Sequence, residues 1–331
     1  MKLLIIGPKF HGYWRSIERA FRELGWDATS HLYDQRSSVS EKALVKLAYE
    51  LPRRLGGHGF VQVDEIETRR ALAVVEAVRP ARVLVIKGDR LGAALFDELD
   101  ARRIPRTLWL YDELRRTRHT DESLGRFDAV ATYSRHDAAE LGAGGREVAF
   151  VPLAFDPGLA FSAEGSSEVT FVGARYPKRE AALVGLHEAG VPVRAYGRDW
   201  SDHGFDRLRT WRLARIKVPS GRDLSLSDSY GIMAGSSATL NIHGDQDGFT
   251  MRTFEASGVG GVQLIDRDDV AEFYDPGTEV VTWASEDELV EHARRAVADR
   301  VWGDRIRAAA RSRTLADHTF VQRARALSSQ W

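Results

Sequence analysis

Residues 239–265 read TLNIHGDQDGFTMRTFEASGVGGVQLI and contain the pattern that decides the fold. Two short segments, TLNIH at 239–243 and VQLI at 262–265, are predicted to be strands, the first of them buried. Between them a glycine-containing loop leads into a predicted helix at 251–257. A strand, a crossover helix and a second strand in this order form the repeating unit of a doubly wound α/β domain.

The same alternation of apolar runs and amphipathic stretches extends over most of the chain. In the first half, strands are predicted at 2–6, 82–86, 107–110 and 129–133, and helices at 15–24 and 68–78. In the second half, strands are predicted at 169–172, 193–196 and 279–282, and helices at 178–189, 286–300 and 304–331. Residues 153–167 contain proline, glycine and serine without a clear period, which indicates a linker between two domains.

Length and composition narrow the class of protein. At 331 residues the chain is long enough for two domains, each with its own core. With 47 Lys and Arg against 48 Asp and Glu, the formal net charge of -1 argues against a protein that coats nucleic acid. The absence of cysteine excludes disulfides, thiolate metal sites and a cysteine nucleophile. No apolar run is long enough for a membrane-spanning helix or a secretion signal, so we expect a cytoplasmic protein.

The loop after the first predicted strand excludes two common nucleotide-binding motifs. It reads GPKFHGYW over 7–14, which is neither the GxGxxG of dinucleotide-binding domains nor a P-loop. Gly12 can still let a ligand approach backbone N–H groups closely, or it can simply serve a tight strand-to-helix turn. An NAD-dependent enzyme or a P-loop ATPase is therefore not expected.

Residues 245–255 carry the strongest signal for a binding site. Asp247 and Glu255 stand at the two ends of a loop and helix start, and acceptor-only carboxylates suit the hydroxyl pairs of a sugar or ribose. Free N–H groups at the helix start near Thr250 suit an anionic diphosphate. Glu255 could equally be an ion-pair carboxylate, and the DQD sequence at 245–247 is a metal-binding pattern elsewhere, although no metal is expected beside a helix start. Two α/β halves place such a site in the cleft between them, at the strands' carboxyl ends.

Two basic segments are candidates for contacts with an acidic ligand. FVGARYPKRE at 171–180 places Arg175, Lys178 and Arg179 between the end of a strand and the next helix, where cations neutralise phosphates. A solvated helix face is the alternative for these cations. A second basic run at 207–222 predicts an amphipathic surface helix that faces an acidic acceptor or, as a peripheral contact, a membrane, rather than a nucleic-acid site.

The chain resembles the CgeB-like glycosyltransferases, which are relatives of spore maturation protein CgeB within the GT-B class. The segments that carry the resemblance follow one another along the chain: VLVIKGD (83–89), LWLYDE (108–113), VPLAFDP (151–157), FVGARYPKR (171–179), YGRDW (196–200), LNIH (240–243), RTFEASGVGG (252–261) and DHTFVQRA (317–324). The ordered series, rather than any one segment, is specific to the family. The spacing of Asp247 and Glu255 also resembles the Glu-x7-Glu element of retaining GT-B enzymes, with Asp in place of the first Glu.

The resemblance implies a GT-B fold with two Rossmann-like domains, 1–155 on the acceptor side and 165–310 on the nucleotide-sugar side, that face a central cleft. It also implies that a helix at 311–331 crosses back towards the first domain. In the implied donor site, Glu255 binds the ribose hydroxyls and Asp247 contacts the donor sugar. The other implied donor contacts are the backbone of Phe249 and Thr250, positive charge from Arg175 and from Lys178 or Arg179, and a loop that closes at Gly12. Gly173, Gly248 and Arg252 complete the predicted donor-binding set.

The expected reaction is transfer of a sugar from a nucleoside diphosphate to a small-molecule, glycan or protein acceptor, with no cofactor besides this co-substrate. Fixed cations and helix N-termini stabilise a leaving diphosphate without a metal, and the resemblance implies that the sugar retains its configuration. Inversion is the alternative, with His11 as the general base and Asp112 orienting it. A nucleotide-sugar epimerase and a non-catalytic nucleotide-sugar-binding subunit also remain open.

Overall fold

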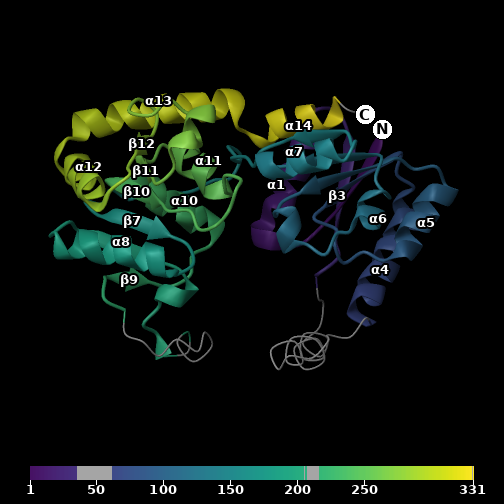
Figure 1. Ribbon diagram of the computed structural model, residues 1–331, viewed down its shortest axis with the longest axis horizontal. Coiled ribbons are helices and arrows are strands. Elements are labelled where there is room, and N and C mark those ends of the chain that lie inside the picture. Colours follow the sequence, from purple (N-terminus) through teal and green to yellow (C-terminus); the bar gives the residue numbers. More distant parts are fainter. Residues whose placement is uncertain (36–61, 205, 207–215, 330) are drawn as a thin grey trace. The chain divides into compact units, whose positions relative to one another are not determined.

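The computed structural model describes residues 1–35, 62–204, 206, 216–329 and 331. These residues form two compact units, one of Met1–Pro152 together with Phe320–Trp331, and one of Leu153–Thr319 (Figure 1). Over the described residues, each unit is built on a six-stranded sheet whose strands pair in parallel.

The first unit has the strand order β2-β1-β3-β4-β5-β6. Its strands are β1 (Lys2–Gly7), β2 (Asp27–Leu32), β3 (Arg82–Ile86), β4 (Arg106–Leu110), β5 (Ala129–Thr132) and β6 (Val148–Phe150). Its helices include α1 (Tyr13–Glu23), α4 (Gln62–Val78), α5 (Ala93–Ala101), α6 (Asp121–Leu124), α7 (Arg135–Ala143) and α14 (Phe320–Ser328). The central strands β1, β3 and β4 are buried on both faces, which is why they appear in the sequence as continuous apolar runs.

The second unit has the strand order β12-β11-β10-β7-β8-β9. Its strands are β7 (Val169–Val172), β8 (Val193–Tyr196), β9 (Ser220–Gly221), β10 (Ala238–Asn241), β11 (Gln263–Ile265) and β12 (Val281–Thr282). Its helices include α8 (Pro177–Glu188), α10 (Leu226–Gly235), α11 (Met251–Gly258), α12 (Glu286–Ala298) and α13 (Arg300–Asp317). Because β7, β10 and β11 are parallel neighbours, the loops that follow them leave the sheet at the same edge.

The predicted α/β alternation is confirmed, and the strands predicted at 82–86, 169–172 and 193–196 coincide with β3, β7 and β8. The sequence analysis missed β2, β6, α5, α7 and α10. Two of these show why. The edge strand β2 buries only Ala28 fully, and α7 buries only Asp137 and Leu141. Elements with so few buried residues leave no apolar period for a sequence pattern to reveal.

The chain differs from the prediction at the expected linker and at the helical tail. Leu153 and Phe155 are buried, and Phe155 forms a parallel bridge with Thr319, so the first residues of 153–167 are part of the second unit's core. The tail is two helices, α13 and α14, rather than one. The break falls at His318, whose carbonyl oxygen accepts the backbone N–H of Phe155.

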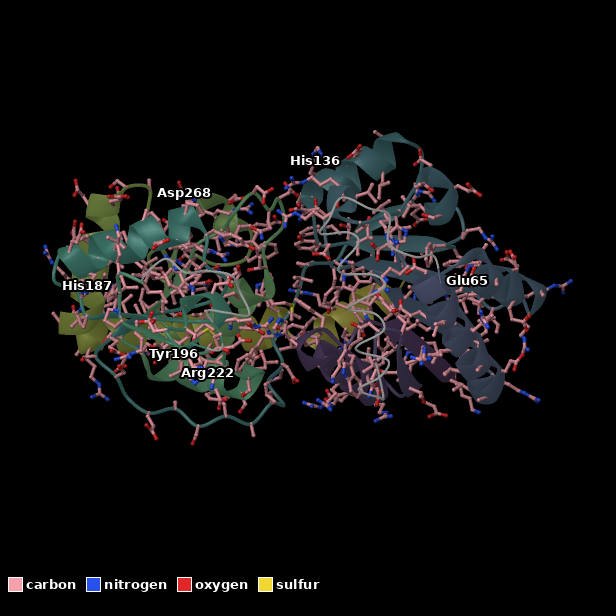
Figure 2. All side chains as sticks on the ribbon, turned by 90° about the horizontal axis from the view of Figure 1, so that it is seen from below. Glu65, His136, His187, Tyr196, Arg222 and Asp268 are labelled. Carbon is pink, nitrogen blue, oxygen red and sulfur yellow. The ribbon has the colours of Figure 1, made fainter. Side chains whose placement is uncertain are left out.

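The basic run at 207–222 is only partly described, since residues 207–215 lie outside the described residues. Its last part is not helical, because Ser220–Gly221 form β9 and pair with β8. Arg222 follows β9, lies near Tyr196 of β8 (Figure 2) and forms an ion pair with Asp206 at 2.8 Å. The predicted amphipathic helix is therefore wrong at its carboxyl end.

Candidate functional site

A buried polar network supports the loop between β10 and α11. Asn241, the last residue of β10, donates from Nδ2 to Oγ1 of Thr253 at 2.9 Å and to Oε1 of Gln263 at 2.6 Å. Gln263 donates in turn to the carbonyl oxygen of Thr253 at 3.1 Å and to Oγ of Ser257 at 2.9 Å. All four side chains are buried, so each bond left unmade would cost free energy. The network therefore fixes where α11 begins relative to the sheet.

Arg267, which lies just beyond β11, fixes the outer part of the same loop. Its Nη1 donates to the carbonyl oxygens of residues 246–247 at 3.1 and 2.7 Å. Its guanidinium group lies 4.0 Å from the ring centroid of Phe249. Gly248 and Phe249 are buried, while Asp247 is half-buried. The loop thus presents the Asp247 side chain and keeps that of Phe249 inside.

The first turns of α11 bring Thr250, Arg252 and Glu255 together. Thr250 is the N-cap residue, and its side chain forms no capping hydrogen bond. Glu255 has no exposed surface, and its Oε2 lies 3.0 Å from Nη1 of Arg252, whose side chain keeps 23% of its surface exposed. Burial raises the pKa of Tyr230, and the negative charge of Glu255 raises it further. Glu255 does form the ion pair that the sequence left open as its alternative role.

Arg175, from the loop between β7 and α8, is buried and forms an ion pair with Glu180. Only 5% of its surface is exposed. Its Nε and Nη2 donate to the two carboxylate oxygens of Glu180 at 3.0 and 2.5 Å. Trp200, 5.6 Å from this guanidinium group, donates from Nε1 to the carbonyl oxygen of Gly173 at 3.0 Å. The Arg175 charge is thus balanced within the unit.

Arg179 lies instead across the ends of β7 and β10. It donates from Nε to the carbonyl oxygen of Ile242 at 2.8 Å and from Nη1 to that of Ala174 at 3.1 Å. Burial lowers the pKa of Arg179, and the positive charge of Arg252 lowers it further, while Asp266 acts in the opposite direction. Arg179 of α8 and Arg252 of α11, each in the first turn of its helix, therefore lie at the same edge of the sheet.

A buried carboxylate joins three elements at the same edge. Asp266, directly after β11, accepts a hydrogen bond from Nζ of Lys178 at 2.5 Å, and its Oδ1 lies 3.0 Å from Nδ1 of His243. The backbone N–H of His243 also donates to it, at 3.0 Å. Burial alone would raise the pKa of Asp266, but the hydrogen bonds from His243 and Lys178 hold that pKa below its ordinary value. Asp266 thereby fixes the loop after β10 to the start of α8.

The sequence analysis did not identify Asp266, His243 or Arg267 as site residues. A signal existed for two of them, because Asp266 and Arg267 directly follow an apolar run that ends at Ile265, and polar residues at that place face the ligand crevice of α/β sheets. His243 was assigned to a strand, whereas β10 ends at Asn241.

The predicted site residues of the first unit lie near the ends of β1 and β4. Gly12 has a φ of 84°, in the left-handed region that glycine adopts without strain. His11 is exposed, and its ring centroid lies 4.4 Å from that of Phe10. Asp112 accepts a hydrogen bond from Nζ of Lys87. Within the described part of this unit, no hydrogen bond or ion pair joins His11 to Asp112, whose carboxylate pairs with Lys87.

Among residues 1–35, 62–204, 206, 216–329 and 331, no group of three or more His, Asp and Glu side chains is placed to hold a metal ion. In the same part of the chain, no helix combines the length and the apolar character needed to cross a membrane.

The chain is similar to a family model and to several solved structures. Residues 178–329 match a family model described as glycosyl transferase-like, and the comparison with curated proteins yields no match. HepE from Anabaena in complex with UDP is similar to the chain, with 14% identity, a TM-score of 0.64, and coverage of 100% of this chain and 99% of HepE. Sucrose-phosphate synthase from Thermosynechococcus elongatus is similar with 12% identity, a TM-score of 0.62, and coverage of 100% and 98%.

A Listeria monocytogenes protein assigned as a UDP-N-acetylglucosamine 2-epimerase is also similar, with 11% identity, a TM-score of 0.57, and coverage of 99% of this chain and 95% of that one. At such identities these likenesses concern the fold, and they confirm the two Rossmann-like units that the sequence predicts. The chain therefore carries a glycosyl transferase-like region over residues 178–329 and has the α/β fold of the GT-B glycosyltransferases.

Proposed function

We propose that the chain is a glycosyltransferase of the CgeB-like kind, which moves a sugar from a nucleoside diphosphate to an acceptor hydroxyl without a metal or other cofactor. The glycosyl transferase-like match over 178–329 supports the activity. Structures of HepE, which shares the fold, contain UDP and UDP-glucose. The ordered motifs of the sequence support the CgeB-like assignment.

The observation that carries the proposal is the pair of guanidinium groups, Arg179 and Arg252, at the carboxyl edge of the second sheet. Like charges at one edge repel each other, and the charge of Arg252 adds to the effect of burial in lowering the pKa of Arg179. Glu255 is the carboxylate that pairs with Arg252, and it lies behind that side chain with no exposed surface. A diphosphate between the two cations would relieve the repulsion, and the start of α11 adds N–H groups and a favourable dipole.

The remaining donor contacts follow from the positions of the loop residues. Asp247, which is half-buried, contacts the donor sugar, and the backbone of Phe249 and Thr250 meets the diphosphate. Glu255 accepts hydrogen bonds from the ribose hydroxyls when Arg252, its partner at 3.0 Å, turns towards the phosphates. Lys178 adds positive charge at the start of α8. Gly12, Gly173 and Gly248 let the backbone approach the donor closely.

Arg175 takes a different part from the one the resemblance implies. Its Nε and Nη2 both donate to Glu180, and only 5% of the residue is exposed. A diphosphate would have to displace a bidentate carboxylate to reach it, which costs more than binding the half-buried Arg179. We therefore assign the leaving-group charge to Arg179 and Arg252, and we assign to Arg175 the positioning of the loop before α8.

The reaction that this set of residues supports is a front-face transfer that retains configuration. The acceptor oxygen bonds to the anomeric carbon as the bond to the phosphate oxygen breaks, and the leaving diphosphate takes the electron pair. The leaving phosphate oxygen then takes the acceptor's proton, so no side-chain base is needed. Arg179 and Arg252 stabilise the negative charge that develops on the diphosphate.

Binding and product analysis test the proposal on the full chain. Thermal unfolding is measured with UDP, GDP, TDP and CDP, and the cognate nucleotide at 100 times its Kd should add about 2.7 kcal/mol of stability. The matching nucleotide sugars are then incubated with candidate acceptors, and NMR of the product gives the anomeric configuration. Failure of all four nucleotides to stabilise the chain would refute the donor site, and an inverted product would refute the front-face mechanism.

A nucleotide-sugar epimerase is the second candidate, favoured by the similarity to the Listeria protein assigned as a UDP-N-acetylglucosamine 2-epimerase. The two activities differ in what happens without an acceptor. An epimerase converts its nucleotide sugar to a second nucleotide sugar, whereas a transferase shows only slow hydrolysis. A non-catalytic binding subunit would be stabilised by the nucleotide and would show neither reaction.

A further inference from the structure

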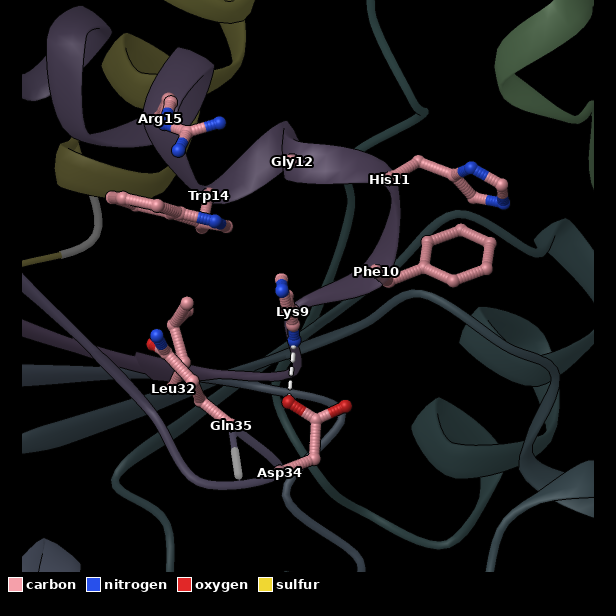
Figure 3. Close-up of a pocket in the computed structure, with 9 residues that line it drawn as sticks. All are labelled: Lys9, Phe10, His11, Gly12, Trp14, Arg15, Leu32, Asp34 and Gln35. Carbon is pink, nitrogen blue, oxygen red and sulfur yellow. Dashed lines mark hydrogen bonds between the residues drawn. The ribbon is translucent and has the colours of Figure 1, made fainter. Parts of the chain in front are cut away.

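The first unit contains a pocket that the proposed donor contacts, apart from Gly12, do not use. The pocket has a volume of about 600 Å³ and is lined by residues within 9–15 and 32–35, from the loop after β1, the start of α1 and the end of β2. Figure 3 shows Trp14 and Leu32 on opposite sides of the hollow, with the Lys9 side chain between them. The cavity is therefore formed by local segments of a single unit.

Trp14 offers a flat surface to this pocket. The guanidinium group of Arg15 lies 4.7 Å from the centroid of the indole and covers one face of the ring. The opposite side of the indole looks into the hollow towards Leu32 (Figure 3). An aromatic face stabilises a flat ring stacked on it, and a large part of that gain comes from burying apolar area. The pocket is thus shaped to take an aromatic ring or the apolar face of a sugar ring.

The charges around the same pocket favour an anion. Lys9 and Arg15 both line it, and within the described residues neither side chain is paired with a carboxylate. Asp34 is the acidic residue of the lining, and its Oδ1 already accepts the backbone N–H of Lys9 at 2.6 Å. Two cations against one engaged carboxylate leave the pocket with an excess of positive charge, which attracts anionic ligands.

We infer that this pocket binds a molecule in which an aromatic or sugar ring carries an anionic group such as a carboxylate. The ring stacks on Trp14, and Lys9 and Arg15 hold the anion. The inference goes beyond the proposed function because it gives the acceptor a chemical class, that of acidic glycosides and acidic aromatic compounds. The inference depends on the proposed function in one respect only, which is that the ligand of this pocket is identified as the acceptor of the sugar.

A matched pair of probes tests the pocket on the full chain. The probes are 4-nitrophenyl β-D-glucuronide and 4-nitrophenyl β-D-glucoside, which share both rings and differ in one carboxylate, and their affinities are measured by ligand-observed NMR titration. The glucuronide should bind more tightly. Lys9→Gln and Arg15→Gln should each weaken its binding about fivefold, as expected for a solvent-accessible charge pair, and leave the glucoside unaffected. Trp14→Leu should weaken both probes.

The control variant is Arg22→Gln, which removes a positive charge from the last turn of α1, where Arg22 pairs with Glu18 away from the pocket. Its affinity for the glucuronide should equal that of the wild type. Equal affinities of the two probes, no saturable binding of the glucuronide, or charge variants that behave like Arg22→Gln would each overturn the inference. Displacement of the glucuronide by UDP would also overturn it, since the pocket would then belong to the donor.

Binding of nucleotides is measured separately, so failure of this pocket and failure of the proposed donor site are distinguishable. Failure of UDP, GDP, TDP and CDP to stabilise the chain, with intact glucuronide binding, refutes the donor site alone. Stabilisation by one of these nucleotides with no glucuronide binding refutes the pocket alone.

Discussion

Glu255→Gln is the substitution that tests the donor site most directly. Glutamine has nearly the shape of glutamate, so the change removes the negative charge and leaves the packing inside α11 almost as it was. Glu255 is fully buried, and its ion-pair partner Arg252 lies 3.0 Å away and reaches water. The substitution therefore acts on two things at once, the ion pair with Arg252 and the proposed hydrogen bonds to the ribose.

The magnitudes of the two effects differ. Removing one partner of a fully buried ion pair costs about 3–5 kcal/mol, and we expect about 1–2 kcal/mol here because water can solvate Arg252. Hydrogen bonds to a charged acceptor contribute about 1.5–3 kcal/mol each, so loss of the ribose contact should raise the Kd about 10- to 100-fold. Chemical denaturation measures the first effect, and calorimetric titration with the stabilising nucleoside diphosphate measures the second.

The affinity for the nucleoside, which lacks phosphates, distinguishes a direct contact of Glu255 with the ribose from an indirect effect of Glu255 through Arg252. If Glu255 binds the ribose, Glu255→Gln should weaken the nucleoside and the nucleoside diphosphate by similar factors. The control is Glu279→Gln, in a second partly exposed pair of the same unit, where Glu279 lies 3.1 Å from Arg313. That variant should lose similar stability and keep its nucleotide affinity. Unchanged nucleoside affinity in Glu255→Gln would refute the ribose assignment, even if the diphosphate bound more weakly.

Three further predictions concern stability at low pH, packing around Gly258 and the group that removes the acceptor's proton. Because the pKa of Asp266 is lowered in the folded chain, its ionised form stabilises the fold above about pH 4, and this contribution is lost as the pH falls further. Between about pH 5 and pH 3, the melting temperature of Asp266→Asn should therefore fall less than that of the wild type. An equal fall in both proteins would contradict the pairing of Asp266 with Lys178 and His243. Gly258→Ala would place a Cβ 2.4 Å from the ring of Phe155 and should lower the free energy of unfolding, measured in urea, by about 1–3 kcal/mol. The control is Gly142→Ala on α7, where a Cβ meets open space and no stability should be lost. Equal losses in the two variants would rule out the steric explanation. Front-face transfer predicts that His11→Gln lowers kcat less than about tenfold, and a fall of about 100-fold or more would support inversion with a general base.

Most of the strands could be predicted because their signal is local. The runs at 83–86 (VLVI) and 169–172 (VTFV) are almost entirely apolar, since a central parallel strand is buried on both faces. Edge elements such as β2 could not be found in this way, because a strand that buries one side chain has no apolar period. The same reasoning located the site region, since the loop from β10 into α11 is short and contiguous in sequence.

The partners of the charged residues could not be predicted. Sequence reasoning treated Arg175, Lys178 and Arg179 as one cluster of cations at a helix start, whereas the structure gives them three different environments. Arg175 is paired with Glu180, Lys178 with Asp266, and Arg179 with backbone carbonyl oxygens. Which cation is left for a ligand depends on these contacts.

The sequence by itself thus determined the two α/β units, the segment at 245–255 as the candidate donor site and the resemblance to a glycosyltransferase family. Only the tertiary structure decided that Arg179 and Arg252 share one edge of the sheet, that Lys87 engages Asp112, and that the first unit has a pocket beside Trp14. The physical reason is the range of the interactions. A buried strand can be recognised from consecutive residues. An ion pair such as that of Lys178 with Asp266 joins residues 88 positions apart, so the two charges meet only once the chain has folded.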